Sequence, residues 1–500
     1  MSSQELLRGI FALIFGAILA WGLYRRYDPL MQDEDSLKPY KHWAPILAPC
    51  LLPVFLMVLL AEILIIDIED TLPMFGTMCA GIFIHMSIYF ALLIALSPLL
   101  RKWISARTCA ALWIIPNMLY ICDMSFMRRS APKRIIRLQG DWMRPAVIIW
   151  LAGAVILFGW KLIEHMIFRR KIRRDSREEQ RPEILDLWED MQHKAKIRTA
   201  DIPLRRSKSV STPLSVGISP RSTFVVLPEE DYSAEEIRLI LRHELIHIVR
   251  RDAQSKLFLT LCTAFCWFNP LMWIAIRRCS EDLELSCDEL VLEDTGEEEK
   301  KRYADLILSS AGESKGFTSS LAPKAESLRY RLRQIMAPAK RLNGGLIAGL
   351  FLFLVLITSG AIAFAYGGGT VAELAFGGEI PVIGSSTNIN PGMRNEYGGV
   401  TVYSRNCTDP EALMEYISGL EVCSLSGSYT MDQPGRFLEM FIPGAGGPRL
   451  VILEENTLQI TNLSRKHAYT RYWYLNESPD WAYIDSLLTG QQIDIAAPEE

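Results

Sequence analysis

Two histidines and a glutamate in the stretch Arg242-His243-Glu244-Leu245-Ile246-His247 have the types and spacing of a metal-dependent hydrolase. The capping-box pattern from Ser233 to Glu236 predicts that a helix begins there and runs through this stretch. His243 and His247 are then one turn apart, so both rings can bind one zinc ion while Glu244 lies beside the bound water. Two histidines on a surface helix are the alternative, but with 7 His in 500 residues a chance HExxH is expected in about 1% of such chains.

A catalytic zinc ion needs a third protein ligand and an open position for water. The acidic stretch 281–289 is the best downstream source of that ligand. We expect Glu284 to bind the single zinc ion of the chain, and Asp288, on the same helix face, to hold a histidine or a basic side chain in place. Glu281 is the fallback ligand. Cys287 is a chemically plausible thiolate ligand, but it points about 60° away from Glu284 on the helix and is expected to be a core residue. For this stretch alone, a solvated acidic helix is the alternative.

A mostly apolar stretch, 257–276, separates the two candidate ligand segments and is long enough to cross a bilayer. If it crossed, His243 and Glu284 would lie on opposite sides of the membrane and could not bind one ion. Asn269-Pro270 also interrupts a continuous helix. We therefore expect a helical hairpin that packs against the core of the enzyme domain or lies in the membrane interface.

The composition argues against a purely cytosolic enzyme. Mean hydropathy is +0.14, and 50% of the residues are hydrophobic against 22% charged, which is high for a soluble chain of this length. The formal net charge of −4 gives no basis for direct nucleic-acid binding. Most of the 10 cysteines lie in apolar runs, where cysteine is usually a small buried residue.

Six apolar runs are candidates for membrane-spanning helices. They are 6–24, 44–66, 73–100, 106–122, 145–168 and 342–366. The first run could be a cleaved signal peptide, but it lacks a convincing cleavage site and two arginines follow it directly, so we expect a retained helix. The run 106–122 is short, and we count it because the orientation of the neighbouring loops requires it.

Lysine and arginine in the short loops set the orientation of these helices. Basic residues cluster after the first run (Arg25, Arg26, Lys38, Lys41) and after the third (Arg101, Lys102, Arg107). Both positions are therefore expected in the cytoplasm, and with six crossings the basic stretch 169–182 is cytoplasmic as well. The loop 123–144 then lies outside although it carries six basic residues, which contradicts the positive-inside rule.

The tail from Gly367 to Glu500 has 17 acidic and 7 basic residues, a net charge of −10. The three glycines at 367–369 predict a flexible hinge. Alternating apolar stretches punctuated by Gly and Pro predict the short strands of a small β-rich domain. Cys407 and Cys423 could pair on the oxidising side, and two free thiols fit the sequence nearly as well.

Three motifs in this order resemble the membrane-bound zinc metallopeptidases of the BlaR/MecR type, bacterial sensor-transducers that derepress β-lactamase genes. They are His243-Glu-Leu-Ile-His-Ile-Val-Arg-Arg-Asp252, Trp267-Phe-Asn-Pro-Leu271 and Glu284-Leu-Ser-Cys-Asp288, and the resemblance covers residues 76 to 315, approximately. It implies a cytoplasmic gluzincin-like domain in which His243, His247 and Glu284 bind zinc and Glu244 is the catalytic carboxylate. It also implies that the activated protease brings about cleavage of a DNA-binding repressor.

The tail departs from the founding members of that family. Their extracellular domain resembles a penicillin-binding protein and carries an acylatable serine in Ser-x-x-Lys. The tail of this chain is too short for that fold, and none of its serines is followed three positions later by Lys. We therefore expect no covalent sensing of β-lactams.

The sequence thus predicts a multi-pass α-helical membrane protein with a cytoplasmic α+β zincin domain and a small extracellular β-rich C-terminal domain. The expected divisions are a membrane domain at 1–168, the zinc metallopeptidase domain at 169–341, a transmembrane helix at 342–366 and the acidic domain at 367–500. A homodimer is compatible with this organisation.

The expected function is signal transduction by cleavage of a cytoplasmic regulator, for which a winged-helix repressor is the candidate. A hairpin at 211–219 and 223–227 could present its edge to an extended substrate, or could be purely structural. A constitutive quality-control protease is the first alternative function. A non-proteolytic receptor is the second, although the intact ligands and Glu244 argue against it.

Overall fold

The computed structural model describes most of the chain. The described residues are 3–24, 56–57, 68–121, 134–138, 142–195, 202–218, 222–292, 295–309, 325–336, 341–376, 378, 380–381, 388–394, 400–402, 406–425, 435–443, 449–462 and 469–489. The helix expected at 44–66 lies outside them, apart from 56–57.

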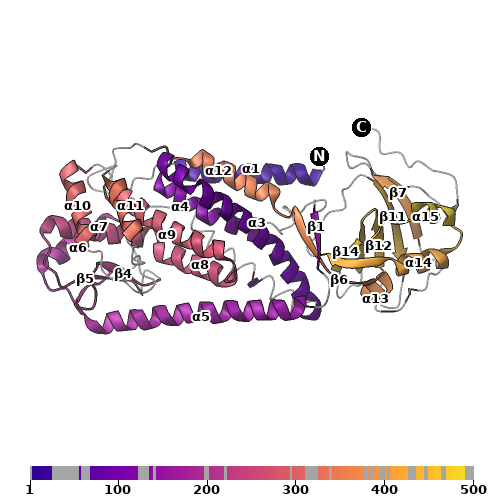
Figure 1. Ribbon diagram of the computed structural model, residues 1–500, viewed down its shortest axis with the longest axis horizontal. Coiled ribbons are helices and arrows are strands. Elements are labelled where there is room, and N and C mark those ends of the chain that lie inside the picture. The colour runs from indigo at the N-terminus through magenta and orange to yellow at the C-terminus, as the bar shows by residue number, and fades with distance from the viewer. Residues whose placement is uncertain are drawn as a thin grey trace.

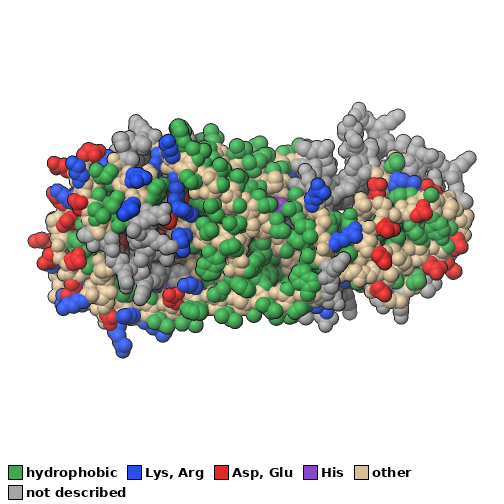
Figure 2. Space-filling view, in the orientation of Figure 1, with side chains coloured by type: hydrophobic (Ala, Val, Ile, Leu, Met, Phe, Trp, Pro, Cys, Tyr) green, Lys and Arg blue, Asp and Glu red, His purple; other side chains and the backbone are tan. Residues whose placement is uncertain are grey.

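The molecule is elongated, with a layer of long helices between two ends of different composition (Figure 1). One end holds the helices and small sheet of the segment 176–336, and the other holds the β-rich tail. Hydrophobic side chains cover the middle of the face shown in Figure 2, and charged side chains gather toward both ends. The middle layer therefore has the surface expected of a part that faces lipid.

Among the described residues, three helices are long and apolar enough to cross a membrane: α1 (Ser3–Tyr24), α3 (Ile68–Trp103) and α5 (Met143–Asp175). They contain the apolar runs expected at 6–24, 73–100 and 145–168, so these helices are confirmed. On α5, Ile149, Val155 and Ile156 are 65%, 72% and 66% exposed. Large aliphatic side chains at such exposure would be unfavourable in water, and this agrees with a lipid-facing surface.

The expected helix at 106–122 is regular only in its first half. It consists of α4 (Ala106–Ile114) and the 3₁₀ helix η1 (Ile115–Ile121). Pro116 has no backbone N–H for an α-helical hydrogen bond, so the regular helix ends before it. Both pieces are packed inside the helical layer, where Leu112, Trp113 and Leu119 are buried.

The prediction of one helix over 342–366 is wrong for the second part of that range. The helix α12 (Gly345–Thr358) has only 14 residues, and Gly360, with φ of 66°, lies just beyond its end. Residues 362–366 belong instead to the strand β6 (Ile362–Thr370), which also contains the three glycines expected to form a hinge. Hydropathy alone could not separate these cases, because an apolar run can be a buried strand as well as a helix.

The helices α1 and α12 pack as an antiparallel pair with reciprocal side-chain caps. The guanidinium of Arg8, near the start of α1, donates to the carbonyl of Leu356 at 2.6 Å, and Asn343, just before α12, donates to the carbonyl of Leu23 at 2.7 Å. Each side chain satisfies a carbonyl at the end of the partner helix. Between the caps the backbones meet closely, since a Cβ at Gly349 would lie 2.5 Å from the carbonyl oxygen of Gly16.

The stretch expected to fold back as a hairpin does so. The helix α8 (Asp252–Phe265) and the helix α9 (Pro270–Val291) are separated by a break at 266–269, where Asn269 caps α9 and accepts from the Leu271 amide. The tip packs on α5, because the ring of Trp150 lies 4.7 Å from that of Phe265, tilted by 57°, and its indole N–H donates to the Phe265 carbonyl. The hairpin shares one core with α3, α4 and α5.

The described part of the segment 176–336 combines a four-stranded sheet with four helices that lie outside the hairpin of α8 and α9. The strands are β2 (Ser176–Glu178), β3 (Leu204–Ser207), β4 (Leu214–Val216) and β5 (Phe224–Pro228), in the order β2-β3-β5-β4. The helices are α6 (Pro182–Lys194), α7 (Ala234–Val249), α10 (Glu297–Ser309) and α11 (Ala325–Ile335). The pair β4–β5 is the expected hairpin, and β4 is an edge strand of this sheet.

The tail is β-rich, as expected. Its strands are β7 (Asn388–Arg394), β8 (Val400–Val402), β10 (Glu421–Leu425), β11 (Gly435–Ile442), β12 (Arg449–Glu454), β13 (Thr457–Asn462) and β14 (Tyr469–Leu475), with a small pair β9 (Asn406–Cys407) and β15 (Leu488–Thr489). The helices α13 (Val371–Phe376), α14 (Pro410–Gly419) and α15 (Trp481–Leu487) complete it. Cys407 and Cys423 are both free thiols.

The basic loop 123–144 contributes a strand to the sheet of the tail. The strand β1 (Arg134–Leu138) pairs in parallel with β6 at one edge of a nine-stranded sheet. Arg137 donates to the carbonyl of Asn476 at 3.3 Å, and its guanidinium lies 5.2 Å from the ring centre of Tyr474. The strand β1 and the tail therefore lie at the same end of the molecule, as the six-crossing arrangement requires.

The close approach of α1 and α12 leads to the first testable prediction. Replacing Gly349 by Leu should lower the thermal stability of the full chain in detergent, because overpacking a tight contact costs about 1–3 kcal/mol. The matched control is Gly9→Leu on α1, where a Cβ meets nothing within 4 Å. Equal melting temperatures for the two variants would contradict the close packing.

Candidate metal centre

The helix α7 begins at the predicted capping box. The backbone amide of Ser233 donates to Glu236 Oε2 at 2.7 Å, and the Glu236 amide donates back to Ser233 Oγ at 3.3 Å. Three turns later, the helix carries His243, Glu244 and His247. The capping residues thus fix where the helix starts and so set the direction in which the two histidines project.

The two histidines and Glu284 converge on one point. The Nε2 atoms of His243 and His247 lie 3.0 Å apart, and Glu284 Oε2 lies 3.8 Å and 3.6 Å from them. Ligands of a tetrahedral zinc ion sit about 3.3 Å from one another, since each bond is about 2.0–2.1 Å long. The three donor atoms therefore fit one metal ion with little rearrangement.

Hydrogen bonds on the far side of each ring leave both Nε2 atoms free to bind. His247 Nδ1 lies 2.6 Å from Asp252 Oδ2, and His243 Nδ1 lies 2.8 Å from the hydroxyl of Tyr303. The Asp252 carboxylate can only accept, so His247 carries its proton on Nδ1. Such partners orient a ligand ring and raise its basicity.

Asp288 is linked to the ring of His243 through the hydroxyl of Tyr303. Its Oδ1 accepts from Tyr303 at 2.8 Å, and Arg331 donates to both of its oxygens at 2.7 Å. A bidentate pair of this kind is the strongest interaction that a carboxylate makes with arginine. Asp288 thus contacts a basic side chain and reaches the histidine through Tyr303, since its own Oδ1 is 3.7 Å from His243 Nδ1.

Glu284 is kept ionised by nearby positive charge. Burial opposes its charged form, but Lys256 and His247 outweigh that cost and hold the pKa of Glu284 well below its usual range. Lys256 Nζ lies 3.1 Å from Oε1, so the salt bridge uses one oxygen and leaves Oε2 directed at the histidines. An anionic oxygen is a suitable zinc ligand.

Glu244 is the buried carboxylate beside this cluster. Its side chain is 3% exposed, and burial raises its pKa above the ordinary value. Ser215 of the edge strand β4 hydrogen-bonds the carboxylate, while Oε2 has no hydrogen-bond partner among the described residues. An acceptor left open in this position could take a hydrogen bond from a metal-bound water.

Glu281 and Cys287, the other candidate ligands of the acidic stretch, make contacts that differ from those of Glu284. Glu281 pairs with Arg101 and Arg278, each at 3.2 Å, and is turned away from the histidines. Cys287 is fully buried and, with both histidines, forms a group whose ligand atoms lie within 4.8 Å of one another. Its Sγ is 3.5 Å from His243 Nδ1 and from the His243 carbonyl, and it also interacts with the ring of His247, so this thiol borders both histidines.

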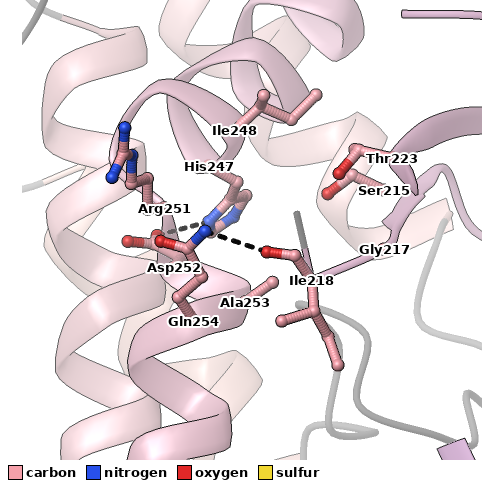
Figure 3. Close-up of a pocket in the computed structure, with 10 residues that line it drawn as sticks. All are labelled: Ser215, Gly217, Ile218, Thr223, His247, Ile248, Arg251, Asp252, Ala253 and Gln254. Carbon is pink, nitrogen blue, oxygen red and sulfur yellow. Dashed lines mark hydrogen bonds and ion pairs between the residues drawn. The ribbon is translucent and has the colours of Figure 1, made fainter. Parts of the chain in front are cut away.

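A pocket lies between β4 and the turn that joins α7 to α8 (Figure 3). Its walls include Ser215 and Ile218 on one side and His247 and Asp252 on the other, and Gln254 ties the two sides together by donating to the Ile218 carbonyl at 3.0 Å. Arg251 has φ of 58°, an uncommon conformation for a residue with a Cβ. This strained turn reverses the chain and brings Asp252 back against His247.

Four residues of the centre were not singled out from the sequence: Asp252, Lys256, Tyr303 and Arg331. Asp252 stands at the start of an apolar helix five residues after His247, and a carboxylate so close to a ligand could have been recognised. Lys256 follows one turn later on the same helix. Tyr303 and Arg331 come from α10 and α11, and no local pattern marks them, because their role depends on how distant helices pack.

The region that contains these residues is similar to known proteins. Residues 136–335 match the family model described as BlaR1 peptidase M56. The regulatory protein BlaR1 of Bacillus licheniformis is 26% identical over 185 residues, which cover 37% of this chain and 30% of that protein. The methicillin resistance mecR1 protein of Staphylococcus aureus is 28% identical over 120 residues, 23% of this chain and 20% of that protein. The chain thus matches less than a third of the length of these relatives.

The metal ligands can be tested by matched substitutions along α9. Glu284→Gln should weaken metal binding by more than about 100-fold, since even partners behind a ligand contribute 10–100-fold. Glu281→Gln, the same change one turn earlier, and Cys287→Ala should leave the metal content of the purified protein unchanged. Loss of metal in Cys287→Ala with retention in Glu284→Gln would assign the third ligand to the thiolate.

Proposed function

Because residues 136–335 form a metallopeptidase domain of the BlaR/MecR type, we propose that this chain is a membrane-embedded zinc endopeptidase that transduces an external signal by cleaving a cytoplasmic regulator. The observation that carries the proposal is the convergence of His243, His247 and Glu284 beside the open carboxylate oxygen of Glu244. The activity, substrate and partners of the whole protein are proposals, since the similarity is confined to part of each chain.

In this proposal the two histidines and Glu284 hold one zinc ion and leave one position for water. Zinc supplies a water acidic enough to lose a proton near neutral pH and polarises the carbonyl of the bond to be cut. Glu244 is placed to accept a proton at its open carboxylate oxygen and would return it to the leaving amine as the peptide bond breaks. Its burial suits this task, because a carboxylate whose pKa is raised both accepts and returns a proton more readily near neutral pH.

The edge strand β4 is the proposed docking site for the substrate backbone. An extended peptide could pair with Leu214–Val216, because an edge strand has unpaired backbone groups. Ser215 lies in the middle of that strand and hydrogen-bonds Glu244. A peptide added there would run beside the catalytic carboxylate and over the pocket of Figure 3.

The distribution of basic residues supports a cytoplasmic enzyme domain and an extracellular tail. Arg101 and Lys102 end α3, and Arg173 and Arg174 end α5, and both helix ends lie toward the enzyme domain. The basic residues of the loop 123–144 oppose this orientation. We infer that the acidic tail offsets part of this cost. Its net charge of −10 attracts them, and the strand β1 is hydrogen-bonded into its sheet.

The route proposed for the signal is continuous in the chain. The strand β1 belongs to the sheet of the tail and leads directly into α5, and α5 leads directly into β2 of the enzyme sheet. Movement of the tail against the membrane could therefore reach the enzyme domain through one helix. Such a signal must bias two arrangements of the packed helices.

Substrate trapping tests the proposed function. A Glu244→Gln chain should keep its zinc, lose at least about 100-fold in cleavage rate, and retain one dominant cytoplasmic protein in cross-linked membranes. The wild-type chain and His247→Ala, which should lose both zinc and cleavage, are the controls. Recovery of many misfolded membrane proteins in place of one regulator would favour the quality-control alternative.

Reporter fusions test the proposed orientation. A reporter fused after Tyr366 should behave as extracellular and one fused at Glu179 as cytoplasmic, and a probe at Ser130 should report the same side as Tyr366. The opposite pair of results would overturn both the count of crossings and the access of the site to a cytoplasmic substrate.

A further inference from the structure

Tyr303 joins the proposed metal site to the helices α10 and α11. It lies on α10, its side chain is 4% exposed, and its hydroxyl is 2.8 Å from both His243 Nδ1 and Asp288 Oδ1. No metal-ligand motif includes it, and it follows His243 by 60 residues in the chain. A buried tyrosine hydroxyl with two polar partners is a specific arrangement and not ordinary core packing.

The directions of these two hydrogen bonds follow from the number of protons available. The tyrosine O–H donates to Asp288 Oδ1, and both oxygens of Asp288 also accept hydrogen bonds from Arg331. The tyrosine oxygen is then left to accept, so His243 must donate from Nδ1. A neutral histidine with its proton on Nδ1 has its lone pair on Nε2, which is the atom that faces His247 and Glu284.

We propose that Tyr303 is a positioning residue for the metal, which fixes the tautomer and the ring orientation of His243. This inference rests on the proposed function, in which His243 is a zinc ligand. The two histidines are then held differently. His247 contacts its carboxylate directly at 2.6 Å, whereas His243 reaches Asp288 only through the tyrosine hydroxyl.

The distances explain why Asp288 cannot replace the tyrosine. Asp288 Oδ1 lies 3.7 Å from His243 Nδ1, beyond hydrogen-bond reach. Cys287 Sγ, at 3.5 Å from the same nitrogen, is a weak acceptor. Removing the hydroxyl would thus leave a buried N–H with a poor partner and a ring less firmly held, so zinc should leave more easily.

The test compares zinc affinity in the full chain, measured by chelator competition in detergent or nanodiscs. Tyr303→Phe, which removes one oxygen and keeps the ring, should bind zinc about 10–100-fold more weakly. The matched control is Tyr232→Phe, whose hydroxyl donates to Glu230 Oε2 at 3.2 Å, and it should bind zinc as the wild type does. The absorption spectrum of the cobalt-substituted protein should change in Tyr303→Phe and not in the control.

A second variant keeps the inference testable if Tyr303→Phe does not fold. Asp288→Asn should also weaken zinc binding. When the two changes are combined, the loss should be smaller than the product of the single losses, because both act along one chain of hydrogen bonds. Melting of the metal-free proteins separates general destabilisation from weaker metal binding.

Wild-type zinc affinity and an unchanged cobalt spectrum in Tyr303→Phe would overturn the inference. If Tyr303→Phe fails to fold, unchanged zinc affinity in Asp288→Asn would overturn it. A wild-type chain that binds no zinc, or one that keeps zinc after His243→Ala, would overturn the proposed function instead, so the two failures can be told apart.

Discussion

The proposed zinc site depends on bringing Glu284 to the two histidines of α7. The three donor atoms lie within 3.8 Å of one another, although an apolar stretch long enough to span a bilayer separates them in sequence. The ion can be bound only if that stretch folds back on itself. The break at Asn269-Pro270 permits the return, and the contacts of the hairpin tip with α5 place its apolar surface inside the helical layer.

The helix α9 therefore belongs to the enzyme domain on one side and to the membrane helices on the other. One side presents Glu284 and Asp288 to the metal site. The other carries Asp282, which is fully buried, accepts from the indole of Trp113 at 2.8 Å and pairs with Arg101 at 2.7 Å. Breaking a buried pair of this kind by removing one partner typically costs about 3–5 kcal/mol. The helix that carries Glu284 is thus fixed to α3 and α4, so a shift of those two helices would change the position of the Glu284 carboxylate.

The tail is attached to the helical layer through two segments. One is covalent, where α12 leads into β6, and the other is the strand β1, which pairs with β6 just before α5 begins. The sheet of the tail thus joins the end of α12 to the start of α5 through the pair β1–β6. This explains in physical terms how a basic loop can lie next to an acidic domain, and why the glycines of β6 are part of a strand and not a free hinge.

The sequence was most informative where one short pattern determines local structure. The capping box, the spacing of His243 and His247, and the interruption at Asn269-Pro270 predicted α7, its ligand face and the hairpin. The prediction from sequence was wrong where an apolar run could form either a helix or a strand. Residues 362–366 read as helix but pair with β1 and β10. Tyr303 and Arg331 could not be found at all, since only the packing of α10 and α11 on α7 and α9 brings them to His243 and Asp288.

The central claim is that two imidazole nitrogens and one carboxylate oxygen bind zinc in this chain. X-ray absorption at the zinc edge of the full-length protein tests it most directly, because it counts the ligands and identifies their atoms. The account predicts only nitrogen and oxygen neighbours at about 2.0–2.2 Å, with a water among them. A sulfur neighbour at about 2.3 Å would contradict it, because Cys287 would then occupy a position assigned here to Glu284 or to the water.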